Sequence, residues 1–494
     1  MSIIPESIQL ATGACALNGS NELDFVLDGV MPIQWQRTYL SDNAHSGILG
    51  KGWSLPFTLF LLRNDEDVVF VDAQGREISF PLQETGQSFY SKYERITLRR
   101  TAVQQWELIT QDGMRLVFGV TDTVDEAHES AQTDLATIAQ DEQRVLLRSI
   151  LDSNGNEFKL RYDTTGLLEL IERSDGFRLQ LAYAGRNFVG GARLIEVRWT
   201  SGDASKPDDP LGSLLVSYRY SSQGDLEEVL DGSGRVCQRF RYVDHQLVER
   251  VEASGLTVQY EWSAHSTSGH VVSMRHSTGL AWSFARDKAT YHVRVTQDSG
   301  ALSRTVEQYF DEDGHIIRSV DAMGAVARWE RDAFGNVQSF TDPEGGITRY
   351  EYDPLGRTLM VVLPDGSQQT TKWFGNLDKP AAIADGLGRT TRFEWDERGN
   401  LLQTTEPDGS TTSYRYDERG LPVTIVDALG KSKQLHYNTL GQLTQYIDCS
   451  GQSTQFSWDL EGNVLSVTDA LGQVTRHGYT YINRRQRLTY LQAP

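Results

Sequence analysis

Polar residues alternate with aromatic or apolar residues along short stretches of the C-terminal third of the chain. Two clear examples are Thr348-Arg349-Tyr350-Glu351-Tyr352 and Thr411-Thr412-Ser413-Tyr414-Arg415-Tyr416. A period of two places alternate side chains on opposite faces of a strand, so the pattern predicts half-buried β-strands. Clusters of Asp and Gly separate these stretches, as expected of tight turns. The pattern therefore predicts an all-β chain.

A repeated unit of 21 residues organises the chain from residue 310 onward. One half of the unit reads aromatic-Asp-x-x-Gly, with Phe310-Asp311, Tyr352-Asp353, Trp395-Asp396, Tyr416-Asp417 and Trp458-Asp459 as its clearest copies. The other half reads Asp-x-x-Gly, and its glycines stand at positions 324, 345, 366, 388, 409, 430, 451 and 472. Neighbouring glycines of this series are 21 residues apart, with a single spacing of 22. A fixed period of this length indicates a repeat protein, in which each unit buries its apolar face only against something else.

Each unit predicts two short strands and two hairpin turns. The turn Asp can accept hydrogen bonds from backbone amides further along the turn, and the Gly three residues later supplies the positive φ that closes it. The aromatic residue recurs once per unit, so the rings are predicted to form a ladder along the sheet. One unit, beginning Trp373-Phe374-Gly375, has irregular spacing and indicates a bulge or a corner of the sheet.

Weaker hairpin signals continue upstream of the regular repeats, for example Asp152…Gly155 and Asp163…Gly166. Residues 119–145 break the pattern, because they are polar, acidic and rich in Ala. We therefore predict an N-terminal β domain at 1–118, a polar insertion or short helix at 119–145, degenerate hairpins at 146–309 and the 21-residue repeats at 310–494.

Composition and charge narrow the class of protein. The chain has 494 residues, which is more than one ordinary hydrophobic core accommodates, and its 44 glycines suit a turn-rich β protein. Only 13 prolines are present, which argues against a disordered Pro-rich chain. The formal net charge of −20 repels phosphate backbones, so nucleic acid is not an expected partner.

Cysteine usage and the N-terminus bear on the compartment. Cys15, Cys237 and Cys449 lie far apart and form no Cys-x-x-Cys, so neither a disulfide framework nor a zinc finger is predicted. The first residues lack the basic and apolar regions of a secretory signal peptide. The longest dense apolar stretch, Leu55 to Leu62, is too short to span a bilayer. We expect a soluble, cytoplasmic protein whose export, if it occurs, uses another route.

The repeat and the N-terminus together resemble a known family. Tyr352-Asp353-Pro354-Leu355-Gly356-Arg357 is similar to the YD repeats of Rhs proteins, the bacterial polymorphic-toxin scaffolds related to insecticidal toxin-complex subunits and teneurins. Ala11-Thr12-Gly13, the run from Pro32 to Tyr39, and Gly52-Trp53-Ser54-Leu55-Pro56 resemble the domain that precedes the repeats in bacterial Rhs effectors. The resemblance covers nearly the whole chain.

The resemblance implies a fold and a function. It implies a spiral β-sheet that forms part of a hollow cocoon, in which a C-terminal toxin is held inactive until delivery in interbacterial competition. The implied partners are the toxin cargo or the remaining shell, with secretion-spike or chaperone proteins, and the implied export is a type VI-like route. The family's late Arg-Tyr-Tyr-Asp-Pro box and its cleavage motif are absent. Asp353-Pro354-Leu355-Gly356 lies in phase with the repeats and is interpreted as an ordinary turn. We therefore expect a shell segment without either end, with enough repeats for a wall rather than a closed container.

Candidate chemistry was sought and none was assigned. Gly430-Lys431-Ser432 fails as a phosphate-binding loop because Ile425 occupies the position of the first glycine. His265, His270 and His276 match no familiar ligand spacing, and a lone Asp per turn is better explained as a turn cap than as a calcium ligand. The sequence thus predicts no catalytic, cofactor-binding or metal-binding residue. Three alternatives remain: a carbohydrate-binding adhesion module that uses aromatic rings such as Trp395 and Trp458, a self-cleaving protease, and a β-propeller.

Overall fold

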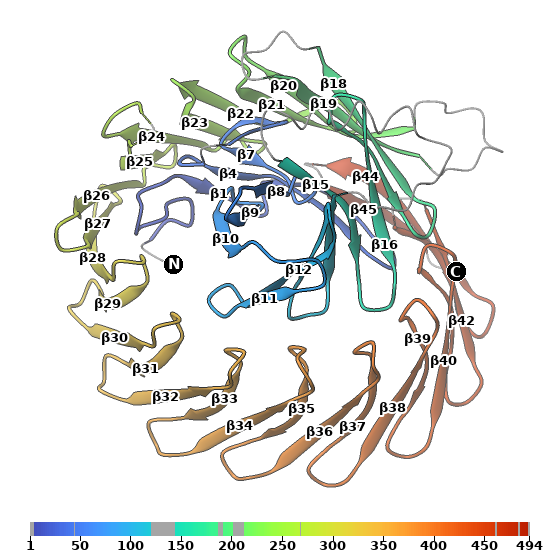
Figure 1. The fold of residues 1–494 in the computed structure, drawn as a ribbon. Coiled ribbons are helices and arrows are strands. Elements are labelled where there is room, and N and C mark those ends of the chain that lie inside the picture. The colour runs from blue at the N-terminus through green and yellow to red at the C-terminus, as the bar shows by residue number, and fades with distance from the viewer. Residues whose placement is uncertain are drawn as a thin grey trace.

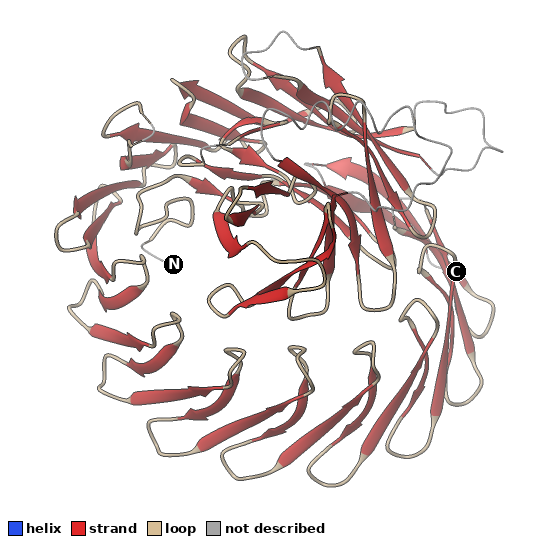
Figure 2. Ribbon diagram, viewed as in Figure 1, coloured by secondary structure: helices blue, strands red, loops and turns tan. Residues whose placement is uncertain are grey.

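Every regular element in the described part of the chain is a β-strand (Figure 2). The computed structural model describes residues 4–43, 45–119, 144–185, 191–200, 212–266, 268–459, 462–482 and 485–492. Across these ranges no helix is long and apolar enough to cross a membrane. The predicted all-β fold is confirmed, because the alternating segments do form strands that pair side by side.

Short strands begin the chain and form three small sheets. Their bounds are β1 (Ala16–Leu17), β2 (Leu23–Leu27), β3 (Ile33–Gln36), β4 (Thr38–Leu40), β5 (Ser46–Gly47), β6 (Gly50–Lys51) and β7 (Trp53–Ser54). One small sheet has the order β1-β4-β7, and β2 pairs with β3 and β5 with β6. A meander follows, made of β8 (Phe60–Arg63), β9 (Asp67–Val71) and β10 (Glu77–Pro81).

From the next strand onward the chain forms one long antiparallel sheet, in which each strand pairs with its successor. The first part comprises β11 (Ser88–Ser91), β12 (Ile96–Ala102), β13 (Gln105–Ile109), β14 (Arg115–Gly119), β15 (Arg144–Leu151), β16 (Glu157–Tyr162), β17 (Leu168–Arg173), β18 (Arg178–Ala184), β19 (Arg193–Thr200), β20 (Ser213–Tyr220), β21 (Leu226–Asp231), β22 (Val236–Val243), β23 (Gln246–Glu252), β24 (Thr257–Trp262), β25 (Val271–His276), β26 (Ala281–Asp287), β27 (His292–Asp298) and β28 (Ser303–Phe310). The start of β15 also pairs with β8, which ties the meander to the long sheet.

The 21-residue repeats supply the rest of the same sheet. Their strands are β29 (Ile316–Val320), β30 (Val326–Arg331), β31 (Val337–Thr341), β32 (Ile347–Tyr352), β33 (Thr358–Val362), β34 (Gln368–Trp373), β35 (Pro380–Ala384), β36 (Thr390–Trp395), β37 (Leu401–Thr405), β38 (Thr411–Tyr416), β39 (Pro422–Val426), β40 (Ser432–Tyr437), β41 (Leu443–Ile447), β42 (Ser453–Trp458), β43 (Val464–Thr468), β44 (Val474–Ile482) and β45 (Arg485–Gln492). The ladder passes residue 310 without a break, because β28 pairs with β29 as every other strand does.

The long sheet curves round the N-terminal strands (Figure 1). In that view it runs from β16 past β24, β30 and β36 to β42, with β1, β4 and β8 inside the curve. A β-propeller is therefore wrong, since its blades would be separate four-stranded sheets. The predicted division at 118, 145 and 309 stays a prediction. Residues 120–143 of the predicted insertion lie outside the described part, while Gly119 ends β14 and Arg144 begins β15.

The turn chemistry predicted from the repeat is confirmed. In the Asp427 turn, the Asp427 carboxylate accepts hydrogen bonds from the amides of Leu429 and Lys431, both at 2.9 Å. The Gly430 amide donates to the carbonyl of Asp427, and Gly430 has a φ of +74°. The same pattern closes the Asp353 turn, which confirms its interpretation as an ordinary turn.

The aromatic ladder is present, and each ring in it has a specific task. The Tyr352 hydroxyl donates to the Val337 carbonyl, 15 residues earlier, at 2.7 Å. The same hydrogen bond, always to a carbonyl 15 residues earlier, is made by Tyr162, Tyr183, Trp262, Trp373, Trp395, Tyr416, Tyr437, Trp458 and Tyr479. Each ring from Tyr352 to Trp458 stands at a register shift in the ladder, so the hydrogen bond fastens the point where pairing is irregular.

The irregular unit at Trp373 differs in its turn rather than in the sheet. The Phe374 amide donates to the Lys379 carbonyl, whereas the equivalent amide of Asp353 donates to a residue one position nearer, Arg357. The register shift beside Trp373 is shared with the regular units. The predicted bulge or corner is therefore wrong as an explanation, because one extra turn residue accounts for the spacing of 22.

Candidate functional site

A buried ionic cluster fastens the N-terminal strands to the long sheet. Arg37, which follows β3, is fully buried, and its guanidinium donates to both carboxylate oxygens of Asp24 on β2, at 2.8 and 3.1 Å. The same guanidinium donates to the Gln238 side chain on β22 at 2.7 Å. Burial disfavours the charged guanidinium, but Asp24 outweighs it and holds the pKa of Arg37 above its ordinary value. The pair therefore stays charged inside the protein.

Aromatic side chains extend this cluster onto the sheet. The Tyr218 hydroxyl donates to Asp24 at 2.6 Å and accepts from the Trp35 indole at 2.9 Å. Burial, reinforced by the Asp24 carboxylate, raises the pKa of Tyr218 well above its usual range, so the phenol keeps the proton that it donates. The Trp53 indole donates to the Tyr242 hydroxyl at 2.9 Å. The run from Pro32 to Tyr39 and Trp53, singled out in the sequence, thus form the anchor between the two parts.

The face that receives the anchor is apolar along its whole length. Two residues before the ladder aromatic, Leu160, Tyr218 and Tyr260 point to this face and are buried beneath the N-terminal part. We call it the concave face, because the sheet curves round the N-terminal strands that lie on it (Figure 1). Cross-strand pairing carries the same face through the repeats, where its members are Trp329, Phe340, Tyr350, Val361, Ile383, Phe393, Tyr414, Ile425, Tyr446, Phe456 and Val467.

In the repeats, this concave face loses its cover. Among the described residues, the last fully buried apolar side chain along the chain is Val306, on β28. Beyond it, the concave-face side chains are half-buried or, at Ile383, exposed. The opposite face is polar, with exposed Arg349 and Glu351 flanking the half-buried Tyr350 on β32. An apolar face next to a polar one marks the concave face as the side that binds something.

Turns of the repeats also contact turns near the start of the sheet. The Leu355 carbonyl accepts hydrogen bonds from the Tyr90 hydroxyl at 2.7 Å and from the Gln111 side chain at 3.1 Å. Further along, the Asn400 amide group donates to Asn154 at 2.8 Å. Similar bonds join Arg95 to Asn336 and Asn156 to the carbonyl of Arg419. This seam holds one end of the repeat hairpins against the N-terminal half.

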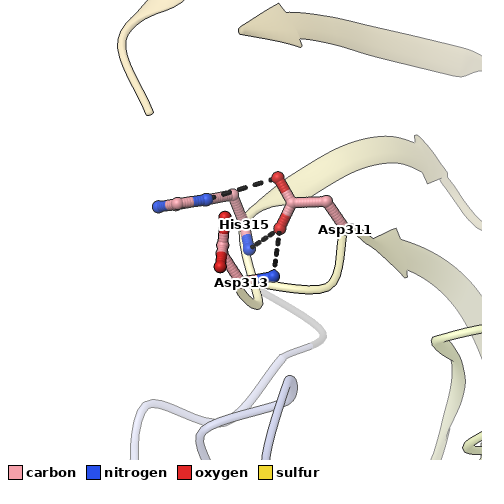
Figure 3. Close-up of side chains that lie close together, drawn as sticks. All are labelled: Asp311, Asp313 and His315. Carbon is pink, nitrogen blue, oxygen red and sulfur yellow. Dashed lines mark hydrogen bonds and ion pairs between the residues drawn. The ribbon is translucent and has the colours of Figure 1, made fainter. Parts of the chain in front are cut away.

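One group of side chains has the spacing of a cation site, and its contacts are those of a turn (Figure 3). Asp311, Asp313 and His315 lie close together after β28. Asp311 accepts from the amides of Asp313 and His315, and its second oxygen contacts the His315 ring at 3.3 Å. The other ring nitrogen of His315 contacts the Tyr93 hydroxyl at 3.1 Å. Both imidazole nitrogens are therefore engaged in the turn and the seam, and we assign no metal to them.

Other reactive side chains are dispersed. His265 contacts Gln246, His270 contacts Ser263, and His276 packs against the Trp282 ring, so each of the three histidines has a different neighbour. Burial raises the pKa of the Cys15 thiol to about 12, which keeps it protonated and unreactive. Cys237 is also buried, and Cys449 is exposed. Across the described residues we assign no catalytic group.

A curved sheet of repeated hairpins, anchored at one end and bare on its apolar concave face, defines a β-repeat protein of the scaffold class. Residues 5–80 match a family described as "Domain of unknown function (DUF6531)". The "RHS Repeat" family matches residues 310–347, 331–368, 377–411, 395–432 and 437–474. Together with the relatives below, these matches make the chain a member of the Rhs family.

The curated relatives are bacterial toxins. The chain is 33% identical over 343 residues to "Toxin protein Tse5" of Pseudomonas aeruginosa, covering 64% of this chain and 25% of that protein. It is 30% identical over 304 residues to "Double-stranded DNA deaminase toxin A" of Burkholderia cenocepacia, covering 62% of this chain and 19% of that one. It is 25% identical over 359 residues to "Probable deoxyribonuclease RhsB" of Dickeya dadantii, covering 68% and 22%. The chain thus spans a quarter or less of the length of these relatives.

Solved structures show a weaker likeness. The "Crystal Structure of TcdB2-TccC3-TEV" aligns with 87% of this chain and 27% of that one, at 12% identity and a TM-score of 0.32. A pore structure of the Photorhabdus luminescens Tc holotoxin aligns with 92% and 27%, at 10% identity and the same TM-score.

Proposed function

We propose that the chain is a non-enzymatic wall segment of an Rhs-type toxin, and that its concave face holds a toxin polypeptide in an inactive state. The observation that carries the proposal is the uncovered concave face. It is the same sheet face that is buried under the N-terminal strands up to β28, and it continues for more than a dozen strands without a partner among the described residues. Apolar surface of this extent is stabilised by contact with another apolar chain.

The toxin names of the relatives support the class of cargo and leave its identity open. Delivery in interbacterial competition, residence in the cytoplasm before export, a type VI-like route, and contacts with spike or chaperone proteins remain predictions of the same proposal. The net charge of −20 continues to argue against nucleic acid as a ligand of the wall itself.

The geometry gives the alternatives less support. Trp395 and Trp458 donate their indole N–H groups to backbone carbonyls and lie half-buried along the sheet, so these rings do not present free faces for stacking on a sugar. Asp353, the residue nearest in sequence pattern to a cleavage site, accepts from two backbone amides and pairs with Arg357 at 2.7 Å. We therefore propose neither carbohydrate binding nor self-cleavage.

Photo-crosslinking from neighbouring positions of one strand tests the proposal. The crosslinking amino acid p-benzoylphenylalanine replaces either Tyr414, on the concave face, or Arg415, its exposed neighbour on the opposite face of β38. The protein is produced from its native locus in its own cells and then irradiated. We expect position 414 to yield an adduct with a toxin polypeptide and position 415 to yield none. Equal adducts from both positions, or none from position 414, would refute the proposal.

A further inference from the structure

The hairpins of the repeats end in two rims, because consecutive turns of an antiparallel meander lie at opposite ends of the strands. Turns that follow the ladder aromatic form one rim, which we call the aromatic-turn rim. The remaining turns form the plain-turn rim, with glycines at 324, 345, 366, 388, 409, 430, 451 and 472. In Figure 1, one set of turns points toward the N-terminal strands and the other points away from them.

The two rims share one turn geometry. In the Asp353 turn and in the Asp385 turn, the carboxylate accepts from the amides two and four residues later. The residue before the glycine therefore occupies the same place at the tip of every regular turn. The tips of the two rims can be compared residue for residue.

Apolar tips are partly covered on one rim and bare on the other. Leu355 and Leu440, on the aromatic-turn rim, are half-buried, and Leu355 lies beside Tyr90 and Gln111. On the plain-turn rim, side chains at the same place are almost fully exposed: Met323 at 94%, Leu387 at 80%, Leu429 at 79% and Leu471 at 84%. No other large apolar side chain of the described residues exceeds 60% exposure. These four tips have no cover of the kind that Leu355 has.

The turn glycines report the same asymmetry independently. A methyl group placed on Gly314, Gly356 or Gly441 would meet Ala11 at 3.3 Å, Arg95 at 3.1 Å or Val30 at 3.0 Å, so this rim abuts the N-terminal part. Placed on the plain-turn glycines it would meet nothing within 4 Å, and this holds for Gly324, Gly345, Gly366, Gly388, Gly409, Gly430, Gly451 and Gly472. One rim of the sheet is packed, and the other is open.

We propose that the plain-turn rim docks a further winding of YD-repeat sheet, whose turns receive Met323, Leu387, Leu429 and Leu471 as the turn region around Tyr90 and Gln111 receives Leu355. Rim-on-rim packing of one sheet against another is already the interface on the aromatic-turn side, through the seam at Tyr90, Gln111 and Asn154. The curated relatives are at least four times as long as the part that this chain spans, so further sheet is available in proteins of this kind.

Charge distinguishes this partner from a second copy meeting rim on rim. The eight four-residue plain turns carry two acidic residues each at 342–345 and 406–409 and one in each of the other six, ten in all, with no Lys or Arg. Two such rims would repel one another. The existing seam shows which chemistry fits: Lys92 lies 3.7 Å from the centre of the Phe334 tip ring, and Arg95 donates to Asn336. We therefore expect basic, aromatic and amide side chains on the facing turns.

Cys449 provides a probe, because it lies in a plain turn and is the one exposed cysteine of the three in the chain. The maleimide reaction rate of Cys449 is measured in residues 1–494 purified alone and in the protein isolated from its producing cells. We expect at least a tenfold slower reaction in the cellular assembly. As a control, a cysteine introduced by Ser457→Cys on exposed β42, in a Cys449→Ser background, reacts equally in both samples. Equal rates for Cys449 would overturn the proposal.

The tips themselves are tested by Leu387→Ser, Leu429→Ser and Leu471→Ser combined, a residue that the Ser450 turn carries naturally at this place. The purified variant should keep its thermal midpoint, because these side chains are exposed, while Cys449 in the cellular assembly returns to the fast rate. Val103→Ser, which removes an exposed side chain near the start of the sheet, should leave Cys449 protected. Protection that survives the triple substitution would overturn the role of the tips.

The partner is identified by p-benzoylphenylalanine at position 429. We expect adducts with peptides that carry Asp-x-x-Gly turns from outside residues 310–482, and adducts with a second copy or with a protein lacking such turns would overturn the proposal. The inference rests on the chain being a wall segment. The adducts from position 414 test that function separately, so a failed rim and a failed concave face are distinguishable.

Discussion

Each turn aspartate satisfies two backbone amides that the hairpin leaves without a partner in the ladder. At Asp427 these are the amides of Leu429 and Lys431, and the same side chain leaves its own amide free to bond the Lys431 carbonyl. Asn438 makes the second of these contacts in its own turn, accepting from the Gln442 amide at 2.9 Å. The oxygen, rather than the negative charge, is thus the feature that the turn needs.

Asp427→Ala should destabilise its hairpin by about 1 kcal/mol, because two amide donors lose their acceptor. Asp427→Asn should lose only a fraction of this, since its side-chain oxygen can accept from the same amides. Hydrogen exchange of the amides in β39 and β40 measures the difference locally. Equal protection in the alanine and asparagine variants would show that the carboxylate oxygen does not hold the turn.

Acid should weaken the repeats before it affects the rest of the chain. Hydrogen bonds from Arg389 to Asp385, from Ser410 to Asp408 and from Ser450 to Asp448 hold the pKa of each carboxyl below its ordinary value. A lowered folded pKa contributes stability that is present above the unfolded value, about 3.9, and is lost as the pH falls through the folded value. Thermal midpoints should therefore be flat from pH 7 to about 5 and fall below about pH 4. A midpoint that rises on acidification would contradict this sign.

At the scale of the element, the ladder aromatic explains why one ring per unit suffices. It follows five or six residues of strand, stands where the pairing register shifts, and bonds to the carbonyl at the start of the preceding strand. Because these contacts join neighbouring hairpins, sequence spacing predicted the strands, the turns and the ladder. It did not predict the hydrogen bond of each ring, since a period of 21 fixes position along the chain and not the distance between a hydroxyl and a carbonyl.

Tyr416→Phe isolates that hydrogen bond, because it removes only the hydroxyl that donates to Leu401 at 2.9 Å. The expected loss is about 1 kcal/mol at most, as the ring is only half-buried. Tyr414→Phe on the same strand is the matched control, since its hydroxyl has no hydrogen-bond partner among the described residues. Faster hydrogen exchange in β37 and β38 of the Tyr416 variant alone checks the prediction. Identical exchange in both variants would assign the ring to packing only.

At the scale of the whole molecule, the decisive contacts join residues that are far apart in sequence. Arg37 meets Gln238 across 201 residues, and Asn154 meets Asn400 across 246. No periodicity reports such contacts, so the anchor residues stood out only by their resemblance to a family, and the coverage of the concave face could not be predicted. Whether a Tyr or Leu of the repeat is buried depends on what the N-terminal strands reach, and they reach β28.

The buried pair of Arg37 and Asp24 should therefore control the stability of the N-terminal half. Arg37→Met leaves Asp24 buried without its cation, beside a tyrosine that keeps its proton, and should cost about 3 to 5 kcal/mol. The double variant Arg37→Met with Asp24→Leu should recover much of that loss, because no unpaired charge remains. Arg389→Met, which breaks the exposed pair with Asp385, serves as the control and should change stability by less than about 1 kcal/mol. Denaturant unfolding followed by Trp fluorescence measures all three, since Trp35 and Trp53 lie in the anchor. If Arg37→Met behaves like Arg389→Met, the ionic cluster does not hold the N-terminal strands on the sheet, and the apolar contacts around Trp35 and Trp53 do so alone.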